Sequence, residues 1–457
     1  MNSATGLDRR VAILGAGLAG LRAAFDLERR GFVATVFEAG SQVGGRTRGE
    51  WCAGHWMDGA WPVLGSRDHS LARWARDLGL GDSMLPLRPV QTTLRTDSKS
   101  IPVDGLSLSG AARIPGPPIW ERPKLLRSNR LMSRYSRWLD PMFPERAADL
   151  DYRSMRDHAV LYFGRGNLEF WLTPEVQAAY GDTVEELSRV AMLLQMKSLG
   201  VGERRPTSSG LPRRPLLELA QAAAERLTIR RETPVTRIDE EPAGGFRVEA
   251  IDADGGHVEQ SFDAVVVAVG SEQASSVSAA LLTPAERDFF ATLEQRPVVT
   301  LSVALDSVEG GLPSEVRLPR RTESAVASVL IEPGQPNGRV PEGRSQLVAL
   351  SRDAFAASSS EMADDVVSKN LLDSLERALP GVGARILTTR LGRGLVPHFT
   401  VGCYRRLAAF QRVQRDRRAL GRRLYWAGDY LSGPGFESAS LSGLRAANAL
   451  VGDFERD

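Results

Sequence analysis

The stretch Val11-Ala12-Ile13-Leu14-Gly15-Ala16-Gly17-Leu18-Ala19-Gly20 decides the fold of this chain. Its apolar first part predicts a buried parallel strand, and residues 18–30 predict a helix with apolar positions at helical spacing. A second apolar run at 32–37 ends directly before Glu38. The three glycines permit a tight turn, close approach of the backbone to a pyrophosphate, and close packing of helix on sheet. This strand–turn–helix–strand unit predicts a parallel sheet that binds a dinucleotide.

The kind of dinucleotide is indicated by the start of the helix and by Glu38. A helix that begins at Leu18 and Ala19 offers free N–H groups and positive potential to phosphates. Glu38, followed by Ala39, would accept hydrogen bonds from an adenosine ribose, and an acid there disfavours a 2′-phosphate. FAD or NAD is therefore favoured over NADP. The alternative is a packing turn between strand and helix that holds no ligand.

Two further motifs, near opposite ends of the chain, choose between FAD and NAD. Gly44-Gly45-Arg46-Thr47 follows Glu38, and Arg46 is placed to pair with the pyrophosphate from the far side. The C-terminal region contains Leu424-Tyr425-Trp426-Ala427-Gly428-Asp429-Tyr430 and then Ser432-Gly433-Pro434-Gly435-Phe436-Glu437. Together with the first glycine turn, these motifs resemble the flavin-containing amine oxidase superfamily, which includes monoamine and polyamine oxidases, protoporphyrinogen oxidases and carotenoid desaturases. The resemblance implies FAD.

The resemblance also implies roles for single residues. Asp429 matches the position that contacts the ribityl or phosphate chain, and the backbone of Val235 matches the position that contacts adenine. The turn at Gly435 would aim backbone N–H groups at the O2 side of the flavin ring, where reduced flavin carries negative charge. The alternatives are a core residue at Val235 and a simple turn at Gly435. The predicted cofactor-binding residues are Gly15, Gly17, Leu18, Ala19, Gly20, Glu38, Ala39, Gly44, Gly45, Arg46, Val235, Gly428, Asp429, Gly435, Phe436 and Glu437.

Composition and charge narrow the class of protein. The chain has 457 residues, of which 42% are hydrophobic and 25% charged, as is ordinary for a globular protein with two large domains. A net charge of +2 gives no sign of nucleic-acid binding. Cys52 and Cys403 are far apart in the sequence, so we expect no disulfide framework and a reducing, cytoplasmic compartment. The histidines lack the spacing of metal ligands, so we expect no catalytic metal. We also expect neither a signal peptide nor a membrane-spanning helix.

The pattern along the chain predicts an α/β fold in two parts. A Rossmann-type, glutathione reductase-like FAD-binding domain is expected to be discontinuous, from residues 1–85, 206–285 and 385–457. An inserted α+β substrate-binding domain is expected from residues 86–205, which should be largely helical, and from residues 286–384. Hydrophobic periodicity and turn signals predict these further strands and helices: a helix at 216–226, strands at 228–238, 246–251, 257–262, 297–306, 325–331 and 346–351, and a helix at 362–379.

The middle of the first insert, residues 120–138, is both basic and aromatic. Trp120 and Trp138 flank a run rich in arginine. A solvated helical face is one explanation of this composition. The other is a helix that lies on a membrane surface, because basic residues together with Trp and Leu suit that interface. Peripheral membrane contact through 120–138 is therefore a hypothesis for this segment.

The marks of the subfamilies are mixed. Amine oxidases of the superfamily carry a lysine on a substrate-domain strand, bridged by water to flavin N5, but the matching run at 297–303 has none. Monoamine oxidases frame the amine between two tyrosines; Tyr404 matches the first, and the second falls on Gly435. The runs 180–188 and 395–402 resemble protoporphyrinogen oxidases better, although Cys403 departs from the histidine usual there.

These marks predict an FAD-dependent oxidoreductase that takes a hydride from a hydrophobic or conjugated small molecule to flavin N5. We expect FAD to be bound non-covalently, because Cys403 is expected to be a small buried residue. Oxygen or a quinone would reoxidise the reduced flavin. No side chain stands out as a general acid or base, and the candidates for lining the pocket are Tyr404, His398 and Phe436. The alternatives are an amine or amino-acid oxidase and, from another class, a carrier or chaperone that holds FAD only as structure.

Overall fold

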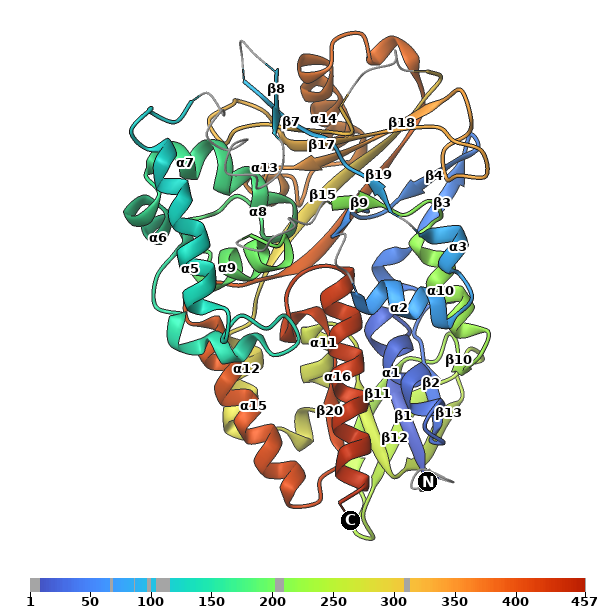
Figure 1. Cartoon of the computed structure of the whole chain (residues 1–457). Helices are drawn as coiled ribbons and strands as arrows, with labels where there is room; N and C mark the ends of the chain where they lie inside the picture. The colour runs from blue at the N-terminus through green and yellow to red at the C-terminus, as the bar shows by residue number, and fades with distance from the viewer. Residues whose placement is uncertain are drawn as a thin grey trace.

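The computed structural model describes residues 9–65, 69–85, 87–96, 100–103, 116–201, 209–307 and 313–456. Its elements confirm the mixed α/β class. In Figure 1 a parallel sheet and its helices form the lower part, where both ends of the chain lie. A large sheet forms the upper part, and a group of helices, drawn in teal and green, lies at its side.

Five parallel strands form the first sheet, in the order β10-β2-β1-β14-β20. β1 (Arg10–Leu14) is central, and α1 (Leu18–Glu28) connects it to its neighbour β2 (Val33–Phe37). The remaining strands of the sheet are β10 (Thr228–Arg230), β14 (Ala264–Val267) and β20 (Leu424–Trp426). Three segments that are far apart in the sequence therefore meet in one sheet.

One face of this sheet is covered by helices that share an apolar cluster with α1. α16 (Phe436–Phe454) packs along α1, and Gly443 makes this approach possible because a Cβ there would lie 2.1 Å from the carbonyl oxygen of Ala19. The other helices of this cluster are α2 (His69–Asp77), α3 (Gly81–Met84) and α10 (Leu216–Ala224). The turn of the first glycines is thus held between a strand and two packed helices.

The opposite face carries an antiparallel sheet of β11 (Val235–Glu240), β12 (Phe246–Ile251) and β13 (His257–Phe262). The predicted hairpin of β12 and β13 is confirmed. The single strand predicted at 228–238 is wrong, because β10 pairs with β2 and β11 pairs with β12 in a different sheet. Glu232, with φ +51°, turns the chain between them. Helices α11 (Ser271–Val277), α12 (Pro284–Ala291) and α15 (Cys403–Ala419) follow in this layer.

The large sheet has the order β19-β15-β18-β17-β16-β7-β8. β15 (Glu294–Leu305) and β19 (Ile386–His398) run antiparallel along their whole length. The other strands are β7 (Thr92–Arg95), β8 (Ser100–Val103), β16 (Glu315–Arg317), β17 (Val326–Pro333) and β18 (Ser345–Ser351). The predicted strands at 297–306, 325–331 and 346–351 are confirmed. The helix predicted at 362–379 is α14 (Asp364–Ala378), preceded by the short α13 (Asp353–Ser358).

The helical group at the side of the large sheet has its own apolar core. Its helices are α5 (Arg127–Tyr135), α6 (Met155–Tyr162), α7 (Arg165–Asn167), α8 (Thr173–Tyr180) and α9 (Arg189–Ser198). Short strands elsewhere are β3 (Gly49–Cys52), β4 (His55–Asp58), β5 (Leu64–Gly65), β6 (Arg88–Pro89) and β9 (Ser209–Leu211). Within the described part of the chain, no helix is long and apolar enough to cross a membrane.

Candidate functional site

The first glycine turn gives its three glycines different surroundings. Gly15 has φ +99°, and a Cβ there would lie 2.8 Å from the carbonyl oxygen of Ala268. A Cβ at Gly20 would lie only 1.9 Å from the carbonyl oxygen of Gly15, so this residue is required for packing. A Cβ at Gly17 would meet no atom within 4 Å. Gly17 therefore borders open space at the start of α1, where a phosphate can approach the backbone.

The start of α1 is also free of competing groups. Gly17 is its N-cap, no side chain caps its backbone N–H groups, and no acidic residue lies in its first turn. The positive end of the helix is thus available to an anion. This arrangement fits a dinucleotide pyrophosphate.

Glu38 is buried at the end of β2, and both of its carboxylate oxygens are engaged. Oε2 accepts a hydrogen bond from the backbone N–H of Ala16 at 2.8 Å, and Oε1 accepts one from Gly40 at 2.9 Å. The backbone N–H of Thr233 donates to the carbonyl oxygen of Glu38 at 2.9 Å. This bond places the segment that leads to Val235 next to Glu38, so the structure brings together two residues predicted to hold the adenosine half.

Arg46 and Asp429 also come together. Nη2 of Arg46 lies 2.6 Å from Oδ2 of Asp429, and the Asp429 side chain is the more buried of the two. The preceding loop is tied to the first turn, because the backbone N–H of Gly44 donates to the carbonyl oxygen of Ala16 at 2.8 Å. The N-terminal and C-terminal motifs therefore form one continuous surface.

The start of α16 resembles the start of α1. Gly435 is the N-cap, has φ +109°, and a Cβ there would meet no atom within 4 Å. Unlike the first turn of α1, that of α16 contains an acid, Glu437, which also lines the cavity described below. Its carboxylate accepts hydrogen bonds from the backbone N–H groups of Ser70 and Leu71, both at 3.0 Å. Burial raises the pKa of Glu437 above its usual value. The Glu437 side chain thus ties the start of α16 to the start of α2.

A cavity of about 860 Å³ opens beside these groups. Gly45, Arg46, Gly435 and Phe436 line it from the parallel-sheet part of the molecule. The large sheet and the helical group supply both polar and apolar side chains, and the exposed area of the wall is mostly apolar. The apolar residues include Met142, Leu194, Leu199, Val298, Leu350 and Leu391. The volume and the predominantly apolar wall are those of a site for a small molecule.

Of the three predicted pocket residues, Phe436 lines the cavity, whereas Tyr404 and His398 are absent from its described wall. Tyr404 is fully buried and stacks on Phe399, with ring centroids 5.4 Å apart. Nε2 of His398 lies 3.6 Å from the Glu186 carboxylate, and burial lowers the pKa of His398 below its usual value. Both side chains pack toward the helical group because the end of β19 and the start of α15 face its core, which sequence could not show.

Cys403 is buried and does not belong to the described cavity wall. Burial raises the pKa of its thiol to about 12. Three residues of β15, Arg296, Val298 and Thr300, line the cavity, and β15 contains no lysine. The strand that matches the lysine-bearing strand of amine oxidases is therefore part of the cavity wall, but with different chemistry.

Apart from Arg46 and Glu437, the charged residues of the cavity wall were not predicted from the sequence. Arg317 lies between two buried carboxylates, with Nη1 2.7 Å from Glu175 and Nη2 3.0 Å from Glu315. Burial raises the pKa of Glu175, which opposes the effect of Arg317. These residues come from α8 and β16, and no motif marks them. Among the described residues no group of three or more His, Cys, Asp or Glu could hold a metal ion.

Comparison with solved structures shows a shared fold. The chain superposes on a putative protoporphyrinogen oxidase from Exiguobacterium sp. 255-15 with a TM-score of 0.74 and 19% identity, over 99% of this chain and 100% of that one. Cyclohexylamine oxidase from Brevibacterium oxydans IH-35A gives a TM-score of 0.74 and 19% identity, over 98% and 100% of the two chains. Wild-type putrescine oxidase bound to putrescine gives a TM-score of 0.74 and 17% identity, over 97% of this chain and 99% of that one.

Sequence comparisons identify the family. A curated relative, protoporphyrinogen oxidase 2, chloroplastic/mitochondrial, of Arabidopsis thaliana, is 55% identical over 40 residues, which are 9% of this chain and only 8% of that protein. The family model described as flavin containing amine oxidoreductase matches residues 18–451. That match runs from the first glycine turn to the end of α16. The chain therefore belongs to the flavin-containing amine oxidoreductase family, whose members are flavin-dependent oxidoreductase enzymes.

Proposed function

We propose that this chain binds FAD non-covalently in a Rossmann-type site and oxidises a hydrophobic or conjugated small molecule. The observation that carries the proposal is the cavity of about 860 Å³, whose mostly apolar wall includes Gly45 and Gly435 from the two predicted cofactor motifs. The open space at Gly17 and the engaged carboxylate of Glu38 support the dinucleotide site. FAD, when bound, supplies the chemistry by accepting a hydride at N5.

The residues of the chain then have simple tasks. When FAD is bound, the uncapped start of α16 at Gly435 would stabilise negative charge on the reduced flavin and so favour reduction. The apolar wall aligns the substrate and keeps water away from the reacting atoms. Such alignment is sufficient when the substrate gives up a hydride readily. A second nucleotide motif is absent from the sequence, so we propose oxygen or a quinone as the electron acceptor.

Oxidation of an amine is the second candidate, because the two amine oxidases share the fold as closely as the protoporphyrinogen oxidase. The absence of lysine from β15 and the glycine at position 435 count against it. The carrier or chaperone alternative is set aside, since the family consists of enzymes. Cys403 favours non-covalent FAD, because burial and a pKa of about 12 disfavour its thiolate.

The test is anaerobic reduction of the purified holoenzyme by a panel of porphyrinogens, polyenes, fatty acids, amines and amino acids, followed by the visible absorbance of the flavin. We expect hydrophobic or conjugated compounds to bleach the flavin faster than simple amines. Acid precipitation of the same sample should leave FAD in the supernatant, as it should for Cys403→Ala. Rapid bleaching by a small amine alone would establish the amine alternative, and colour retained in the wild-type pellet would show a covalent link.

A further inference from the structure

The arginines of the cavity wall are mostly committed to partners within the protein. Nε of Arg48 donates a hydrogen bond to the carbonyl oxygen of Gly45 at 3.0 Å. The Arg48 side chain also lies beside Gly40, in the predicted adenosine half of the site. The other wall arginines with carboxylate partners pair as follows: Arg46 with Asp429, Arg296 with Asp353, Arg317 with Glu175 and Glu315, and Arg393 with Asp364.

Arg390 on β19 is different. Its Nε donates to Oε1 of Glu50 at 2.8 Å, and the Glu50 side chain is 58% exposed. Neither Nη1 nor Nη2 of Arg390 has a hydrogen-bond partner within the described part of the chain, and Nη1 is buried. A buried N–H donor without an acceptor is unfavourable and is commonly satisfied by water or a ligand.

The local backbone holds this guanidinium at the cavity. A Cβ at Gly59 would lie 3.0 Å from Nη1 of Arg390, so a side chain there would press on the guanidinium. A Cβ at Gly392 would lie 2.6 Å from the carbonyl oxygen of Gly59 and 2.7 Å from Oγ1 of Thr300. Gly59, Thr300, Arg390 and Gly392 all line the cavity. The two glycines therefore let β19 and the loop after β4 approach closely and place the Arg390 guanidinium in the wall.

We propose that Arg390 binds the carboxylate of an amphipathic substrate whose apolar part lies in the cavity beside the cofactor site. The Arg390 side chain is 25% exposed, and its buried Nη1 lacks a hydrogen-bond partner. A planar guanidinium of this kind matches the geometry of a carboxylate. The carboxylates of the described wall are engaged within the protein: Glu175 and Glu315 pair with Arg317, Asp140 pairs with Arg146, and Glu437 accepts hydrogen bonds from backbone N–H groups. An ammonium group would therefore meet no unpaired carboxylate among these residues. The inference deepens the proposed function and rests on it for the claim that the bound molecule is a substrate.

The test measures binding, not turnover, by titrating the FAD-loaded protein with decanoate and with decylamine in a calorimeter. We expect Arg390→Gln to weaken decanoate binding about tenfold, because a hydrogen-bonded ion pair is lost, and to leave decylamine binding unchanged. Arg390→Lys should give an intermediate loss. Glu50→Gln should tighten decanoate binding about two- to fivefold, because the carboxylate that pairs with Arg390 is neutralised. Arg9→Gln, which alters an exposed pair with Asp263, is the matched control and should change neither affinity.

Opposite effects of Arg390→Gln and Glu50→Gln separate a ligand-binding role from a structural ion pair, in which both variants would weaken binding. No decanoate binding by the wild type, equal decanoate binding by wild type and Arg390→Gln, or equal losses for decanoate and decylamine would each overturn the proposal. Because decanoate binding needs no flavin reduction, failure of every compound to bleach the flavin would refute the proposed function and leave this measurement standing.

Discussion

Gly17 and Gly20 lie in the same turn, but their surroundings demand glycine for different reasons. At Gly20 the protein itself leaves no room for a Cβ, since the nearest backbone oxygen would be 1.9 Å away. At Gly17 the space around the missing Cβ is open, and the residue has φ −76°, which any side chain tolerates. The folded protein therefore does not need glycine at Gly17. Only a ligand that approaches the backbone would need it.

We predict from this contrast that Gly17→Ala and Gly20→Ala fail in different ways. Gly17→Ala should melt within a few degrees of the wild type as apoprotein but retain far less FAD, because its methyl group occupies the approach of the pyrophosphate. Gly20→Ala should lower the melting temperature of the apoprotein itself, since overpacking costs about 1–3 kcal/mol or more. Thermal melts without FAD and the FAD content of the purified proteins measure the two effects. Normal FAD retention by Gly17→Ala would refute the assignment of the pyrophosphate to this turn.

The segment around α5 is an amphipathic element whose outer face remains uncovered. Ile119 and Trp120, in the turn before it, are 77% and 74% exposed, and Leu126 is also exposed. Leu131 and Met132 face the helical core, whereas the arginines of α5 face outward. Asp140 and Met142, just after this segment, line the cavity. We therefore keep the proposal that residues 120–138 dock on a membrane surface, next to the cavity.

The test of membrane docking is a charge reversal on this face. The triple variant Arg130→Glu, Arg134→Glu and Arg137→Glu should bind vesicles that contain anionic lipid at least about tenfold more weakly at low salt, because each basic residue contributes about 1 kcal/mol near such a surface. The matched control reverses Arg405, Arg412 and Arg415, which are exposed on α15, and should bind like the wild type. Co-sedimentation measures both. If the wild type does not sediment with anionic vesicles, the segment is a solvated face.

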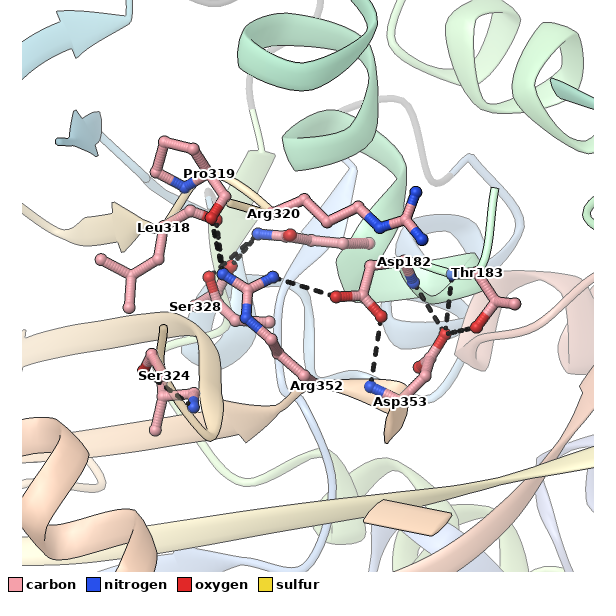
Figure 2. A network of polar contacts seen from close by, with 12 residues as sticks. Asp182, Thr183, Leu318, Pro319, Arg320, Ser324, Ser328, Arg352 and Asp353 are labelled. Atoms are coloured by element: carbon pink, nitrogen blue, oxygen red, sulfur yellow. Dashed lines mark hydrogen bonds and ion pairs between the residues drawn. The ribbon is translucent and has the colours of Figure 1, made fainter. Parts of the chain in front are cut away.

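A buried ionic network connects the helical group with the large sheet (Figure 2). Oδ2 of Asp353 accepts hydrogen bonds from the backbone N–H groups of Asp182 and Thr183, at 2.7 and 3.1 Å, and Oδ1 lies 2.8 Å from Nη1 of Arg296. Arg352 donates to Asp182 at 3.0 Å and also to carbonyl oxygens of the loop after β16. Arg296 lines the cavity, so the network also positions part of its wall.

We predict that Asp353→Ala destabilises the whole protein. The change leaves Nη1 of the buried Arg296 and the backbone N–H groups of Asp182 and Thr183 without their acceptor. Removal of one partner of a buried ion pair costs about 3–5 kcal/mol. Asp353→Asn, which keeps acceptor oxygen but not charge, should lose less. Asp254→Ala, in the exposed turn before β13, serves as control. Urea unfolding, followed by circular dichroism, measures the stability of the three variants and the wild type. An unfolding midpoint of Asp353→Ala equal to that of the wild type would contradict the prediction.

The sequence alone determined the parts of this protein that depend on local patterns. The glycine turn, the strand–helix–strand unit and the hairpin at 246–262 follow from periodicity and turn residues, which act over a few neighbouring positions. The motifs at 44–47 and 424–437 sufficed to recognise the family. The break between β10 and β11 escaped this reasoning, because partner strands from two different sheets decide it.

Only the tertiary structure decided which side chains face the cavity. Tyr404 and His398 stood next to family motifs, but the packing of α15 and β19 against the helical group turned both away from the wall. Arg317 and Arg390 carried no local signal and entered the wall through the pairing of strands. The physical reason is range: propensity and turn chemistry are properties of adjacent residues, whereas the direction of a buried charge is set by whichever distant segments supply its partners.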